Sequence, residues 1–246
     1  MAKRILFPLP DHDFDVTEVA VPWQLLREAG HEVVFATEHG AVPAADPLLL
    51  SGVLFGQLGA EPEPIGFYRS LEQAASFQAP TRWGDLAIAD FDALFLAGGH
   101  APGMRQYLGS HALQRFCVDF WQTERPVAAI CHGVLVLARS RGSDGKSVLH
   151  HRRTTCLPKY MERTAYYLTA WKLGTYYRTY PAYVEDEVKQ SLRSPSQFER
   201  GAFNLTRRGT RDDDRGAFVV RDGNYLSARW PGDAYRIGKD LLAVLG

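Results

Sequence analysis

The stretch Ala128-Ala129-Ile130-Cys131-His132-Gly133 joins a short apolar strand directly to a helix over residues 134–139. A compact apolar run of this length is typical of a buried parallel strand. A cysteine at so tight a strand-to-helix turn is held out at the edge of the sheet, as in a nucleophile elbow. The small residues Ala129 and Gly133 relieve crowding around it. The stretch therefore predicts an α/β fold with Cys131 as a candidate nucleophile.

The segments on either side alternate between strand and helix patterns. Thr17 is a good N-cap for the first helix, which ends at Gly30, and Asp222-Gly223 favours a hairpin. Strands are predicted over 4–9, 31–36, 91–97, 127–130, 217–220 and 225–228, and helices near 68–77 and over 111–123, 134–139 and 233–245. This order predicts a doubly wound, mostly parallel sheet with helices on both faces.

The whole chain, residues 1–246, is predicted to form one α/β domain. Repeated prolines mark an insertion around 38–90, and a tyrosine-rich helical segment is expected around 158–192, split near Tyr180-Pro181. Hydrophobic residues make up 46% of the chain and charged residues 23%, which fits a protein with a buried core and argues against disorder.

Charge and cysteine content restrict the class of partner. Lys+Arg and Asp+Glu are both 28, so the formal net charge is zero and no nucleic acid or membrane partner is expected. Three cysteines at wide spacing argue against disulfides and for the reducing cytoplasm, and no secretion signal or membrane-length apolar run is present. A small-molecule substrate is the expected partner. Zero net charge favours self-association, so monomer and homodimer both stay open.

Two further groups are expected at the edge of the sheet that carries Cys131. Gly98-Gly99-His100 follows a predicted strand, and glycines there let the backbone approach a ligand and donate N–H groups to an oxyanion. Glu18 lies near the start of the first helix, where a carboxyl group close to a thiol can remain protonated or move protons. The loops 11–18, 98–103 and 131–133 should converge. A helix-dipole glutamate and an ordinary turn are the alternative interpretations.

The helix that follows Cys131 suggests how its thiol would be activated. A helix N-terminus favours the thiolate, so the pKa of Cys131 is expected to be lowered. Backbone N–H groups around Gly133 are candidate oxyanion donors. A buried, inert cysteine that acts only as a small hydrophobic residue stays the alternative.

These pieces together resemble the ThiJ/PfpI superfamily, which shares the class I glutamine amidotransferase-like fold. The residues that carry the resemblance are Glu18, Gly98-Gly99-His100, the stretch 129–133 and Trp230-Pro231-Gly232-Asp233. The chain looks most similar to the branch of heat-shock chaperones and glutathione-independent glyoxalases. The resemblance implies a flavodoxin-like sandwich with a nucleophile elbow.

The resemblance also implies a catalytic Cys-His-acid triad. Its first two members correspond to Cys131 and His132, and Glu162 is the best candidate for the acid, with Asp186 and Glu185 as weaker ones. The loop after Gly98-Gly99-His100 departs from the branch, because Ala101-Pro102-Gly103 stands where a further glycine is usual. That departure leaves the shape of the oxyanion site and the size of the substrate open.

The function implied by the resemblance is that of a cofactor-independent, cysteine-dependent lyase of the glyoxalase III type, acting on small reactive carbonyls. Cys131 would add to an aldehyde such as methylglyoxal, and Glu18 would move a proton between adjacent carbons. A Cys-His pair suits acyl transfer equally well, so an amidase, peptidase or isonitrile hydratase is an alternative. A stress chaperone or redox sensor, with Cys131 as an oxidisable thiol, is another.

A metal site is not predicted from the sequence. His12 lies between Asp11 and Asp13, but nothing supplies a third ligand at a telling spacing.

Overall fold

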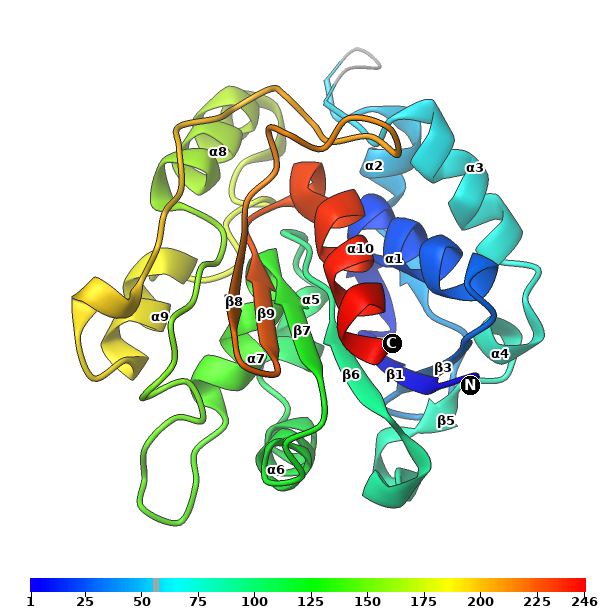
Figure 1. Ribbon diagram of the computed structural model, residues 1–246. Helices are drawn as coiled ribbons and strands as arrows, with labels where there is room; N and C mark the ends of the chain where they lie inside the picture. Colours follow the sequence, from blue (N-terminus) through cyan, green and yellow to red (C-terminus); the bar gives the residue numbers. More distant parts are fainter. Residues whose placement is uncertain (55–57) are drawn as a thin grey trace.

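The protein is built around a mostly parallel β-sheet, which the computed structural model describes within residues 1–54 and 58–246 (Figure 1). In these residues the sheet has seven strands in the order β5-β3-β1-β6-β7-β9-β8, and its neighbours are parallel except β8 and β9. The predicted doubly wound sheet is therefore confirmed. The strands are β1 (Arg4–Pro8), β3 (Glu32–Thr37), β5 (Thr81–Arg82), β6 (Ala93–Leu96), β7 (Val127–Ile130), β8 (Val219–Asp222) and β9 (Tyr225–Ala228).

Helices cover both faces of this sheet. In Figure 1, α1 (Val16–Glu28) and α10 (Ala234–Leu245) lie side by side in front of it, and α5 (Met104–Leu108) and α7 (Val134–Arg139) lie behind it. The remaining helices are α2 (Pro47–Ser51), α3 (Pro62–Leu71), α4 (Ala75–Gln78), α6 (His111–Trp121), α8 (Lys159–Leu173) and α9 (Val184–Ser191). Among the helices of the described residues, none has the length and apolar character needed to cross a lipid bilayer.

The start of α1 differs from the prediction. Asp15, and not Thr17, is the N-cap, because its carboxylate accepts hydrogen bonds from the N–H groups of Thr17 and Glu18 at 2.8 and 3.0 Å. The loop predicted over 11–18 contains the short strand β2 (His12–Phe14), which pairs with β4 (Ala44–Ala45). The chain at 44–46 runs alongside this segment, and Asp46 N–H donates to the carbonyl of Phe14 at 3.0 Å.

The insertion contains short helices, but the one expected near 68–77 is wrong in its bounds, because α3 ends at Leu71 and α4 begins at Ala75. The prolines at 62 and 64 do not break α3 but lie in its first turn, where a missing N–H group costs nothing. The chain then turns at 72–74 before the short helix α4. The prolines thus mark the start of a helix. From the sequence alone, a proline at a helix start cannot be distinguished from one that ends a helix.

A buried ion pair fixes the turn from β9 into α10. Arg229 and Asp233 are 1% and 0% exposed, and the guanidinium donates to the carboxylate from Nε at 2.9 Å and from Nη2 at 3.0 Å. Asp233 also accepts hydrogen bonds from the N–H groups of Phe218 and Arg229. A charge pair buried this deeply is tolerable only because its polar atoms are paired.

Three loops meet at the carboxyl ends of β1, β6 and β7. Asp15 N–H donates to the carbonyl of Gly98 at 2.9 Å, and Gly103 N–H donates to Oδ2 of Asp13 at 2.7 Å. The order of the sheet reverses between β1 and β6, and ligands of doubly wound folds bind at such a switch point. The predicted convergence is confirmed, and it defines the region to search for a site.

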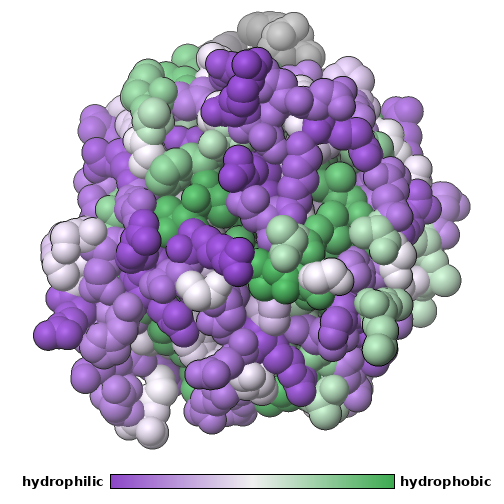
Figure 2. All heavy atoms as spheres, in the orientation of Figure 1, coloured by the Kyte–Doolittle hydropathy of each residue, from purple (hydrophilic) through white to green (hydrophobic). Residues whose placement is uncertain are grey.

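Figure 2 shows that hydrophilic side chains cover most of the face seen in Figure 1, with apolar side chains in patches between them. Several exposed apolar residues belong to α8 and to the chain after α9, among them Trp171 and Phe203. Three others, Leu58, Leu168 and Leu205, line the cavity described below. The mouth of that cavity is therefore apolar.

Candidate functional site

Cys131 sits at a strained strand-to-helix turn. β7 ends at Ile130, residues Cys131–Gly133 form a single 3-10 turn, and α7 begins at Val134. Cys131 has a φ of 58°, a left-handed conformation that costs a non-glycine residue about 1–2 kcal/mol. A Cβ at Gly133 would come within 2.2 Å of the carbonyl oxygen of Leu96, so only glycine lets the turn pack against β6. The local chain is thus a nucleophile elbow.

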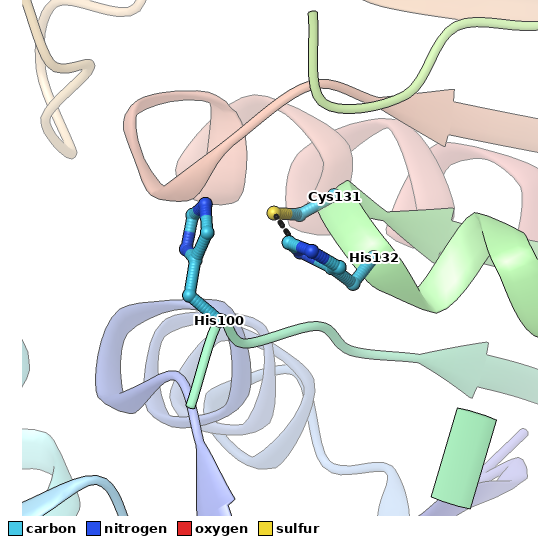
Figure 3. Close-up of side chains that lie close together, drawn as sticks. All are labelled: His100, Cys131 and His132. Atoms are coloured by element: carbon cyan, nitrogen blue, oxygen red, sulfur yellow. Dashed lines mark hydrogen bonds between the residues drawn. The ribbon is translucent and has the colours of Figure 1, made fainter. Parts of the chain in front are cut away.

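His132 connects the thiol to a threonine. Its Nδ1 lies 3.5 Å from Sγ of Cys131, as the dashed line in Figure 3 marks, and its Nε2 lies 3.3 Å from Oγ1 of Thr179. Thr179 donates its only hydroxyl proton to the carbonyl of His100, at 2.6 Å. The hydroxyl must therefore accept from Nε2–H of His132. Burial lowers the pKa of His132 well below its usual value, so the ring is neutral and the lone pair of Nδ1 faces the sulfur.

Glu18 is fully buried beside the elbow. Its Oε2 accepts a hydrogen bond from Gly98 N–H at 2.8 Å, and its Oε1 has no hydrogen-bond partner among the described residues. A Cβ added to Gly98 would lie 2.8 Å from Oε2 of Glu18 and 2.9 Å from Cβ of Cys131, so the two side chains flank the same glycine. Burial, and then the charge of Asp15, raise the pKa of Glu18 well above its usual value. One carboxyl oxygen is fixed and the other is free.

The pKa of the Cys131 thiol is raised, which reverses the expected lowering. Burial is the main cause, and the charges of Glu18 and Asp15 add to it, whereas the backbone N–H of His132 acts in the opposite direction. The helix N-terminus is too weak to outweigh these effects. The resting cysteine is consequently a thiol, and its reaction needs a proton acceptor such as Nδ1 of His132.

Of the glycines predicted as oxyanion donors, Gly98 has its amide engaged elsewhere. Gly98 N–H is taken by Glu18, so it is not free to stabilise an oxyanion. Gly98 and Gly133 instead allow close contact, since a Cβ at either would clash with neighbouring backbone or with Glu18. Gly99 lies against the carbonyl of Asp13, which a Cβ would approach to 2.7 Å.

His100 faces Cys131 and His132 from the loop after β6 (Figure 3). The ring centroids of His100 and His132 are 4.6 Å apart, at an interplanar angle of 74°. Nε2 of His100 is buried and has no hydrogen-bond partner within residues 1–54 and 58–246, and burial lowers its pKa to about 4. One ligand atom from each of His100, Cys131 and His132 lies within 4.8 Å of the other two. Among the residues that the structure describes, these three side chains form a group that could hold a metal ion.

Glu162 does not reach His132, in contrast to the implied triad. Its Oε1 accepts from Arg178 at 2.9 Å and its Oε2 from the N–H of Val184 at 3.0 Å, which ties α8 to the start of α9. Burial raises its pKa to about 7, even though Val184 and Arg178 oppose the shift. The weaker candidates are also engaged elsewhere: Glu185 pairs with Lys189 and Arg200, and Asp186 with Lys159.

Thr179, which occupies the place expected for the acid, was not identified from the sequence. It lies in the chain between α8 and α9, where no periodicity or motif marks it. Only the packing of this chain against the elbow brings its hydroxyl to His132.

A cavity of about 190 Å³ opens beside His100. Asp15, Tyr177 and Arg208 are among its polar lining residues. Its other walls are mostly apolar and include Leu49, Val53, Leu157, Met161, Ala165 and Trp230. Such a cavity suits a small organic molecule.

Comparison with known proteins places this geometry in context. A family model described as ThiJ/PfpI family-like matches residues 9–201. The uncharacterized protein C14C4.04 of Schizosaccharomyces pombe is 31% identical over 72% of this chain and 67% of its own length. The glutathione-independent glyoxalase hsp3102 of the same yeast is 24% identical over 58% of this chain and 59% of its own length. This chain thus spans about two thirds or less of the length of these relatives.

The fold is also found among solved structures. The crystal structure of glyoxalase III from Candida albicans superposes with a TM-score of 0.67, covering 98% of this chain and 97% of that one at 19% identity. The superposition shows a shared fold. At this identity it does not show a shared activity, which has to be argued from the residues of the site.

Proposed function

Because the chain belongs to the ThiJ/PfpI family, we propose that it is a cysteine-dependent enzyme that converts small reactive carbonyls, of the glutathione-independent glyoxalase type. The observation that carries this proposal is the free Oε1 of Glu18, held beside the Cys131 thiol by the hydrogen bond from Gly98. A relative named as a glutathione-independent glyoxalase supports the same class of substrate.

The first step would be addition of the thiol to an α-oxoaldehyde such as methylglyoxal. Sγ of Cys131 forms a bond to the aldehyde carbon while its proton passes to Nδ1 of His132, which faces the sulfur. His132 then gives that proton to the aldehyde oxygen, and a hemithioacetal results. The hydrogen bond from Nε2–H to Thr179 keeps Nδ1 free to accept the proton.

The second step would be an internal redox shift. Oε1 of Glu18, as the carboxylate, removes the proton from the hemithioacetal carbon and returns it to the neighbouring carbon through an enediol. Burial raises the pKa of Glu18, and a carboxylate with a raised pKa is a stronger base. The aldehyde carbon is oxidised to a thioester and the ketone carbon is reduced to an alcohol, so no external oxidant is needed. Water then hydrolyses the thioester to lactate and regenerates the thiol.

A hydrolase is less well supported by the same geometry. Acyl transfer needs N–H donors that are free to bind an oxyanion. The Gly98 amide, which was expected to be one of them, already binds Glu18. The glyoxalase route also ends in an acyl transfer to water, so what distinguishes it is the proton transfer between carbons, which uses the free Oε1 of Glu18 directly.

The test is lactate formation from methylglyoxal by the purified protein without glutathione. Wild type and a Cys156→Ser control, which removes a buried thiol outside the site, should both turn over. Cys131→Ala should abolish turnover, and Glu18→Gln should reduce it by about a hundredfold or more, since general acid–base catalysis typically contributes about 10²–10⁴-fold. No lactate from wild type, or equal rates from Cys131→Ala, would overturn the proposal.

A further inference from the structure

We propose that His100, Cys131 and His132 form a binding site for a thiophilic divalent metal ion, with Zn²⁺ as the fitting case. The proposed carbonyl chemistry does not use this ion. The proposal rests on the positions of the three side chains and on their unused lone pairs, so it stands whether or not methylglyoxal is a substrate.

The distances suit a tetrahedral ion. Zn²⁺ binds sulfur at about 2.3 Å and nitrogen at about 2.0–2.1 Å, so a sulfur and a nitrogen on one ion lie about 3.5 Å apart. Sγ of Cys131 and Nδ1 of His132 are 3.5 Å apart in the structure. The whole cluster fits within 4.8 Å, so a side-chain shift of about 1 Å at His100 would complete the set.

The two histidines each have a ring nitrogen whose lone pair is available to bind a metal ion. The bond from Nε2–H of His132 to Thr179 leaves Nδ1 unprotonated, and metal-binding histidines typically donate their second N–H in this way. Thr179 is itself held by the carbonyl of His100. Nε2 of His100 is buried without a partner in the described part of the chain, which is costly unless something binds there.

The surroundings supply access and charge. His100 lines the cavity of about 190 Å³, and Cys131 and His132 are buried behind it, so an ion would reach the cluster past His100. The carboxyl group of Glu18 flanks the same glycine, Gly98, as the side chain of Cys131. Ionisation of this group on binding would offset the single positive charge that remains when one thiolate binds a divalent ion.

Binding would switch off the thiol. As the bond from metal to sulfur forms, the S–H bond breaks and its proton leaves to solvent, with no change in oxidation state. The sulfur lone pair is then committed to the ion and cannot attack an aldehyde. A chelator that removes the ion restores the free thiol.

The experiment uses untagged, full-length protein stripped with a chelator. Zn²⁺ binding is measured by calorimetry without any carbonyl substrate, and Co²⁺ serves as the spectroscopic probe. We expect one ion per chain and a thiolate-to-cobalt charge-transfer band. His100→Ala and Cys131→Ser should each weaken binding by about a hundredfold or more, since even a second-shell change costs 10–100-fold. Circular dichroism shows that each variant folds, and His100→Asn provides a smaller change if His100→Ala does not.

The matched control removes histidines elsewhere. His150 and His151 lie with ring centroids 4.7 Å apart, outside the cluster, and could hold an adventitious ion. The double variant His150→Ala/His151→Ala should bind Zn²⁺ as wild type does. No binding by wild type, or equal binding by the His100 and Cys131 variants, would overturn the site. Failure of the lactate assay alone would leave the binding result unchanged, so the two proposals are separable.

Discussion

The amide of Gly98 donates a hydrogen bond to Oε2 of Glu18 over 2.8 Å, so the loop after β6 holds the carboxyl group that follows β1. This bond crosses the switch point of the sheet. It leaves Oε1 as the only carboxyl oxygen free for chemistry and removes one amide from any oxyanion site.

Gly98→Ala is expected to impair both activity and stability. The new Cβ would lie 2.7 Å from the amide nitrogen of His132 and 2.8 Å from Oε2 of Glu18, and overpacking of this kind costs about 1–3 kcal/mol. Gly66→Ala is the control, because Gly66 lies within α3 with no atom within 4 Å of an added Cβ. It should stabilise the fold by about 0.5–1 kcal/mol. Urea unfolding and the lactate assay measure both effects, and equal behaviour of the two variants would contradict the close packing.

Thr179→Val should disturb the proton position on His132. Without the hydroxyl acceptor, Nε2 loses its partner and the proton is free to move to Nδ1, which removes the acceptor for the thiol. We expect kcat to fall by about 10–100-fold and Thr179→Ser to recover most of it. Nitrogen NMR of His132 should show the tautomer shift. Thr37→Val is the control, as it removes a buried hydroxyl that bonds Ala41 away from the site; an equal fall there would argue for a general packing effect.

Glu162→Gln should leave turnover within about threefold of wild type. Loss of a proton-transfer group would instead lower turnover by about a hundredfold or more. Glu162 binds Arg178 and the N–H of Val184, and an amide oxygen can accept from either. Steady-state kinetics on methylglyoxal measure the effect. A fall as large as that of Thr179→Val would show that Glu162 acts on His132 during the reaction.

Glu185 should stabilise the fold in a pH-dependent way. Burial alone would raise its pKa, but hydrogen bonds from Arg200, Lys189 and the N–H of Lys159 lower it from 4.5 to about 2. A lowered carboxyl pKa gives stability that is present above pH 4.5 and is lost as the pH falls towards 2. Glu185→Gln should thus lose up to about 3 kcal/mol near pH 7 and match wild type near pH 2.

Denaturant unfolding across this pH range tests the expectation for Glu185. Glu32→Gln, at an exposed glutamate paired with Arg4, is the control and should show a much smaller difference. A loss for Glu185→Gln that does not depend on pH would mean that its ion pairs contribute only by packing.

Asp233→Asn should destabilise the fold by about 3–5 kcal/mol, because it leaves the buried Arg229 without a counter-ion. The control is Asp240→Asn, which breaks an ion pair of the same i,i+4 spacing with Arg236 at the surface. That change should cost below about 1 kcal/mol. Similar midpoints of thermal unfolding for both variants would contradict the burial of Arg229.

The parts of the fold that the sequence predicts are those with local signals. The run 127–139 shows its strand, turn and helix in consecutive residues, and the hairpin of β8 and β9 is marked by Asp222-Gly223. The start of α1 is not decided locally, because both Asp15 and Thr17 are good capping residues. The chain entering through β2 selects Asp15.

In the candidate site, too, some residues could be predicted from local sequence signals and others could not. Glu18 and Cys131 are predicted because each follows a strand at the same edge of the sheet. The link from His132 to Thr179 is not, since it depends on how the chain between α8 and α9 returns to the elbow. The raised pKa of Cys131 could not be predicted from the neighbouring sequence either, because burial is a property of the assembled fold.

The hydroxyl of Thr179 lies outside the strand edges that carry Glu18, His100 and Cys131. It belongs to residues 174–183, the linker between α8 and α9, and its anchors are the carbonyl of His100 and Nε2 of His132. The group that positions the imidazole is therefore encoded apart from the strand ends that carry the reacting groups. A library of variants confined to this linker can retune the imidazole without touching a strand, which gives directed evolution a compact and modular target.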